Sequence, residues 1–172
     1  MDEMLKLQEN IELNNFTKLL DLCFEISSYF SFTKNIDFSI EERETRAKFL
    51  KELEPFYVKT IKTQHWHCYY VPPENVKEVY LFKTDMNAKP IIQKYFDNIF
   101  LEERNYSGDI VGEFKPVPED LCFFYQNKLL LGTVSHENIC YAYPHSEQLM
   151  VEFEKLGYWK RVLFSDEEQV SI

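Results

Sequence analysis

The segment Gln64–Cys68, with the sequence QHWHC, holds the residues of this chain best suited to bind a metal ion. Alternate side chains of a strand share one face, so His65 and His67 would present two imidazoles about 7 Å apart. Zinc sites commonly add a third protein ligand, and His136 or Glu137 could supply it. No spacing in the sequence fixes that ligand, and histidine is equally common at the half-wet edge of a sheet. We therefore expect no metal or cofactor, with metal binding by His65 and His67 as the alternative.

A second chemically suggestive group is Thr133–Glu137, which places a hydroxyl, an imidazole and a carboxylate in succession. A serine nucleophile needs its base within hydrogen-bond reach. Neighbouring residues of a strand point to opposite faces, so Ser135 and His136 cannot form that pair on a strand. We predict a hairpin turn here, with His136 and Glu137 exposed, and no catalytic residues.

The cysteines and glycines indicate a reduced environment and no nucleotide loop. The four cysteines lie far apart in apolar or aromatic runs, which is typical of buried thiols; they are Cys23, Cys68, Cys122 and Cys140. The 4 glycines stand alone, so no glycine-rich phosphate-binding motif is present. The acidic first residues do not resemble a signal peptide, and no apolar run reaches the roughly 18 residues of a membrane span. We expect a cytoplasmic protein without membrane contact.

Acidic side chains outnumber basic ones, at 29 against 19, and the net charge is −10 at pH 7. Binding to nucleic-acid phosphate needs clustered positive charge, so we expect no direct contact with nucleic acid. A basic protein would instead be attracted by the negative field, although such a charge can also serve solubility alone. Aromatic residues make up 16% of the chain, and exposed tyrosine and tryptophan often carry the binding energy at protein interfaces.

These features favour a non-catalytic acidic protein that neutralises a basic partner. Its most concrete form is a bacterial immunity protein that inhibits a nuclease toxin, because such a toxin needs a positive groove that an acidic surface can cover. A DNA-mimicking phage inhibitor fits the same description. The expected contacts lie at the start of the second helix, at the end of the third, and on one tyrosine nearby: Glu41, Glu42, Glu44, Glu102, Glu103 and Tyr106.

Two other functions remain open at this point. A small metal-dependent hydrolase would use His65 and His67. A structural or regulatory subunit of an assembly would instead present an apolar surface patch. Further aromatic candidates for a binding surface are Tyr69, Tyr70, Tyr141, Tyr143 and Trp159. The further acidic groups are Glu119 with Asp120, and Asp166 with Glu167 and Glu168.

Helices are expected mainly at the front of the chain. Apolar residues at helical spacing predict a helix over about 15–31, preceded by a lead-in helix over 3–13. A capping box formed by Ser39 and Glu42 predicts a second helix that stops before Pro55, with a loop over 31–38. A third helix is expected from Asp85 through Phe100, with Pro90 in its first turn.

Strands are expected behind these helices. The aromatic and β-branched segment 56–71 predicts a strand, and segment 75–84 its hairpin partner. Four short strands should follow within 109–143 as a meander, then a helix from Ser146 closed by Gly157, and a last strand over 158–164. Because the strands are grouped, the sequence predicts a single α+β domain over 1–172. Its mainly antiparallel sheet of about five to seven strands would pack against about four helices, two of them N-terminal, one central and one near the C-terminus.

Overall fold

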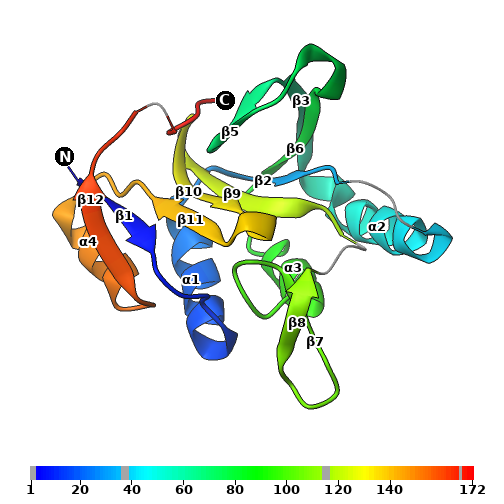
Figure 1. Cartoon of the computed structure of the whole chain (residues 1–172), viewed down its shortest axis with the longest axis horizontal. Helices are drawn as coiled ribbons and strands as arrows, with labels where there is room; N and C mark the ends of the chain where they lie inside the picture. The colour runs from blue at the N-terminus through cyan, green and yellow to red at the C-terminus, as the bar shows by residue number, and fades with distance from the viewer. Residues whose placement is uncertain (1–2, 36–38, 114–116, 167) are drawn as a thin grey trace.

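An antiparallel sheet of eight strands forms the centre of the computed structural model, which describes residues 3–35, 39–113, 117–166 and 168–172 (Figure 1). The strand order is β12-β1-β11-β10-β9-β2-β6-β3. The bounds are β1 Glu3–Leu7, β2 Tyr29–Thr33, β3 Tyr57–Thr63, β6 Lys77–Lys83, β9 Glu119–Tyr125, β10 Lys128–Val134, β11 Ile139–Ala142 and β12 Trp159–Leu163. The predicted α+β class with a mainly antiparallel sheet is confirmed, with more strands than expected.

Two small hairpins stand apart from this sheet. One joins β4, His65–Trp66, to β5, Tyr69–Tyr70, and the other joins β7, Glu102–Arg104, to β8, Ile110–Glu113. The predicted meander is confirmed for β9, β10 and β11, which pair in succession. The segment 109–117 that precedes them forms β8 of the separate hairpin instead, and its residues 114–116 lie outside the described residues.

Four α-helices in the described chain pack on one face of the main sheet (Figure 1). They are α1 Leu13–Ile26, α2 Ile40–Leu53, α3 Lys89–Tyr95 and α4 Glu147–Glu154, and short 3-10 turns η1 Glu54–Phe56, η2 Pro73–Asn75 and η3 Ser135–Glu137 join the elements. As predicted, the Ser39 hydroxyl caps α2 by accepting a hydrogen bond from the Glu42 N–H at 3.1 Å. None of the described helices is both long and apolar enough to cross a membrane.

Phenylalanines of the sheet fill the core beneath these helices. The Phe30 ring stacks on Phe82 with a centroid distance of 5.1 Å and also lies close to Phe24 and Phe123. All four side chains are buried. Much of the unusual aromatic content therefore packs the core rather than the surface.

The opposite face of the sheet carries a smaller core that is covered by the β4–β5 hairpin and the C-terminal residues. Trp66 of the hairpin packs against Phe124, and Val170 belongs to the same buried cluster. The C-terminal segment is held by backbone hydrogen bonds from the Leu129 N–H to the Val170 carbonyl and from the Ile172 N–H to Asn127. This second face positions the candidate site.

The N-terminal predictions were wrong in two places. Residues 3–7 form β1 rather than a lead-in helix, because β1 is enclosed between β11 and β12 and buries Leu5 completely. The helix expected over 15–31 ends at Ile26, and Tyr29–Thr33 form β2 between β6 and β9. Strand pairing on both sides overrides a helical pattern in such short apolar segments. Residues 36–38 of the expected loop lie outside the described residues.

The third helix is shorter than predicted. It has Pro90 in its first turn as expected, but it ends at Tyr95. Phe96, Ile99 and Phe100 are still buried, although they are not helical. The Ile99 N–H donates to the Ile11 carbonyl at 3.0 Å, so this stretch pairs with the chain before α1 instead of continuing the helix. α4 and β12 form where predicted, although the residue that directly follows α4 is Lys155 rather than Gly157.

Candidate functional site

The β4–β5 hairpin turns tightly at His67 and Cys68. The strand that was expected to run over 56–71 is broken after β3, and β4 ends at Trp66. Cys68 has a φ of 62°, a left-handed conformation that reverses the chain direction and is uncommon for a non-glycine residue. The turn directs His67 toward the sheet and leaves Cys68 half-buried.

His67 is completely buried against β10 and β11. Its Nε2 lies 3.2 Å from the Tyr143 hydroxyl, and the edges of the Tyr141 and Tyr143 rings surround it. Burial lowers the pKa of His67 to about 4, and a contact with the Thr133 backbone opposes this only in part. The imidazole is therefore neutral at pH 7.

Cys68 links this histidine to the C-terminal segment. Its Sγ lies 3.3 Å from the His67 Nε2, and the thiol donates to the Glu168 Oε2 at 3.5 Å. Burial and the nearby Glu168 carboxylate raise the pKa of the Cys68 thiol. Cysteine hydrolases use a thiolate beside a base, whereas this pair is a thiol beside a neutral imidazole. The arrangement does not supply an activated nucleophile.

A pocket of about 550 Å³, called here the hairpin pocket, opens above this turn. Its lining is His65, Cys68, Tyr69, Tyr70 and Glu168. The His65 ring stacks on Tyr70 with a centroid distance of 4.2 Å and an interplanar angle of 7°. Tyr70 is 79% exposed. The pocket therefore combines an accessible aromatic surface with a carboxylate.

The two histidines of the metal alternative occupy different environments. His65 stacks on Tyr70 at the pocket, while His67 is buried against Tyr143. The expectation of a shared face assumed a strand through both residues, but β4 ends between them. Among the described residues, neither histidine belongs to a group of three possible metal ligands.

The turn predicted at His136 and Glu137 is present as η3, and both side chains are exposed. Ser135 is buried, and its hydroxyl contacts Asp120 at 3.0 Å rather than His136. All four cysteines are free, and the three besides Cys68 are buried as expected.

The acidic residues predicted to contact a partner lie on the helical face, the side of the main sheet that the four α-helices cover, away from the hairpin pocket (Figure 1). Glu41, Glu42 and Glu44 belong to the first turns of α2, while Glu102, Glu103 and Tyr106 belong to the β7–β8 hairpin and its turn. The Lys94 ammonium of α3 contacts Glu52 of α2, and Arg104 of β7 contacts Asp97 just after α3. The two acidic groups are thus on separate elements, with α3 between them.

The remaining aromatic and acidic candidates are divided between core and surface. Tyr106 is fully exposed, Tyr143 is buried, and Trp159 packs against Phe153. Glu167 lies outside the described residues. Sequence reasoning named Tyr70 and Glu168 only as members of separate groups, because nothing local in the sequence indicates that the C-terminal segment returns to the hairpin.

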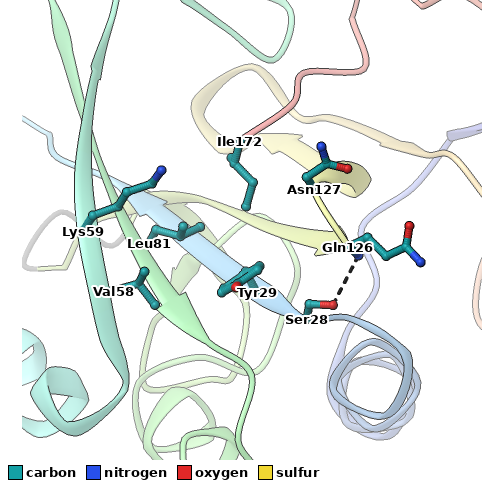
Figure 2. A pocket seen from close by; sticks show the side chains of 8 residues that line it. All are labelled: Ser28, Tyr29, Val58, Lys59, Leu81, Gln126, Asn127 and Ile172. Atoms are coloured by element: carbon teal, nitrogen blue, oxygen red, sulfur yellow. Dashed lines mark hydrogen bonds between the residues drawn. The ribbon is translucent and has the colours of Figure 1, made fainter.

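A second hollow of about 470 Å³ lies on the same face of the sheet, between β3 and the end of the chain (Figure 2). Figure 2 shows Tyr29 and Leu81 of the sheet at its base, with Val58 and Lys59 on one side and Ile172 on another. Its polar groups include Gln126, whose N–H donates to the Ser28 hydroxyl at 3.2 Å. Its lining includes no acidic side chain and no exposed aromatic pair comparable to the hairpin pocket.

No protein-family model, curated protein or solved structure matches this chain.

Proposed function

We propose that this protein is a non-catalytic binding protein that neutralises a basic protein partner, and that the hairpin pocket receives a cationic side chain of that partner. The observation that carries this proposal is the stacked pair of His65 and Tyr70 beside the Glu168 carboxylate. An arginine or lysine side chain could lie on the exposed Tyr70 ring while its charge approaches Glu168. Such a contact combines cation–π attraction with an ion pair.

The hairpin already makes a contact of this kind within the chain. The Lys77 ammonium lies 5.7 Å from the centroid of the Tyr69 ring. Arginine and tyrosine are also among the residues that most often dominate binding energy at protein interfaces. A partner arginine on Tyr70 would therefore repeat chemistry that the hairpin supports internally.

The charge of the whole chain supports the same class of partner. A net charge of −10 would speed the approach of a basic protein and would make association sensitive to salt. The most concrete form of the proposed function is an immunity protein in the cytoplasm that covers the positive groove of a nuclease toxin. The acidic residues of α2 and of the β7–β8 hairpin would then serve steering, because they lie on the opposite face of the sheet from the pocket.

The experiment begins by capturing the partner from the native host with the tagged protein at low and moderate salt. A stoichiometric basic protein that salt releases is the expected result. Its affinity is then measured for Tyr70→Ala and for Glu168→Gln. We expect each change to weaken binding about tenfold, corresponding to about 1.4 kcal/mol.

Matched controls decide which face binds. Tyr106→Ala removes a still more exposed tyrosine from the β7–β8 hairpin, and Glu41→Gln removes a carboxylate from α2. Tyr106→Ala should leave both rates unchanged, whereas Glu41→Gln should leave the dissociation rate unchanged and lower only the salt-dependent association rate. Normal binding by the Tyr70 and Glu168 variants, with loss in the controls, would move the interface to the helical face.

The hydrolase alternative has less support. It would need His65 and His67 to share a metal ion, and the hairpin turn holds their rings in separate environments. Zn²⁺ binding that is unchanged in His65→Ala, with the fold retained, would remove any need for it.

A further inference from the structure

We propose that Glu119, Asp120 and His136 form a binding site for a divalent transition metal ion, with Zn²⁺ as the best-matched ion. This proposal is independent of the hairpin pocket and uses different residues. One carboxylate oxygen from each acidic residue and one ring nitrogen of His136 lie within 4.8 Å of one another. The three side chains come from β9 and the η3 turn.

The spacing of the three donors is close to that of a zinc site. The His136 Nδ1 lies 3.7 Å from the Glu119 Oε2. Zinc bonds of 2.0–2.2 Å in a tetrahedral arrangement place neighbouring ligand atoms about 3.4 Å apart. Small side-chain rotations would therefore bring the donors around one ion. The combination of one imidazole with two carboxylates also suits zinc better than the all-oxygen shell preferred by magnesium or calcium.

A buried oxygen of Asp120 without a hydrogen-bond donor is the independent sign that this cluster suits a cation. Asp120 is 1% exposed, and its Oδ1 accepts hydrogen bonds from the Ser135 N–H at 2.7 Å and from the Ser135 hydroxyl at 3.0 Å. Its Oδ2 is also buried but has no hydrogen-bond partner in the described chain. Leaving a carboxylate oxygen buried without a donor is costly, and a metal ion would satisfy it.

The surroundings support the imidazole as a ligand. Its other ring nitrogen, Nε2, lies 3.8 Å from the Glu137 Oε1. Metal-bound histidines commonly direct their second nitrogen toward a carboxylate, which orients the ring. His136 is 40% exposed and Glu119 is 19% exposed, so an ion can reach the site from solvent.

Two cationic side chains limit how tightly the site can hold an ion. Arg46 is close enough to Glu119, and Lys77 to Asp120, for their charges to interact. We therefore expect one Zn²⁺ per chain, bound at micromolar concentrations, rather than an ion so tight that it survives every purification.

The test uses the full-length, metal-free protein titrated with Zn²⁺ against a competing fluorescent indicator. The wild type should bind one ion, and both His136→Ala and Glu119→Gln should bind it at least tenfold more weakly. The matched controls are His145→Ala, a histidine stacked on Tyr125, and Cys68→Ala, which removes the half-buried thiol; both should bind within twofold of wild type. These variants leave Asp120 and its bonds to Ser135 in place.

A second readout separates folding from metal binding. Zn²⁺ should raise the melting temperature of the wild type and of both controls, but not that of His136→Ala. Absence of wild-type binding at micromolar Zn²⁺ would overturn the proposal. Loss of binding in Cys68→Ala together with its retention in His136→Ala would equally overturn it, because the ion would then lie at the hairpin.

Discussion

Lowering the pH from about 7 to about 4 is expected to remove about 3 kcal/mol of folding free energy through His67 alone. Burial lowers the pKa of His67 from 6.5 to about 4 in the folded chain. Between these values the unfolded chain binds a proton that the folded chain rejects, so stability falls as the pH falls. The contribution of His67 is complete above pH 6.5 and lost below about pH 4.

Urea unfolding at a series of pH values tests this expectation. Between about pH 7 and about pH 4, the unfolding free energy should fall by about 3 kcal/mol less in His67→Gln than in wild type. His65→Gln is the matched control, because His65 lies two residues away at the pocket surface. An unchanged pH dependence in His67→Gln would show that the imidazole is not held neutral by burial.

Replacing Gly132 with alanine is the second large effect, with an expected loss of about 3 kcal/mol. A Cβ at this position would lie 2.7 Å from the His67 Nδ1 and 2.7 Å from the Leu129 Cδ2. Both neighbours are buried, and β10 is paired on each side by β9 and β11, so the strand cannot easily move. Gly132 is thus the position that lets the His67 ring lie against the sheet.

A double-mutant cycle identifies the cause of this loss. Removing the imidazole with His67→Ala should make Gly132→Ala less costly by at least about 1 kcal/mol, measured by denaturant unfolding. Leu129 would remain close, so the rescue should be partial. Strict additivity of the two changes would mean that Gly132 does not act through His67.

Much of the local structure could be predicted from neighbouring residues. The capping serine and the proline that bound α2, the apolar stripe of α1, and the turns between β9, β10 and β11 each act within a few residues. The same holds for the exposed η3 turn at His136. These features need no knowledge of distant parts of the chain, which is why the α+β class was accessible.

The sequence by itself therefore determined the class of fold, the helices with strong caps or stripes, the meander and the acidic character of the chain. Only the tertiary structure decided that residues 3–7 and Tyr29–Thr33 are strands, since a short apolar segment takes the conformation that its neighbours in the sheet can pair with. The tertiary structure also brought Glu168 to Cys68, 100 residues away, and Asp120 to the turn that holds His136. Such contacts depend on how strands are ordered and on where the chain end packs, and no local pattern encodes either.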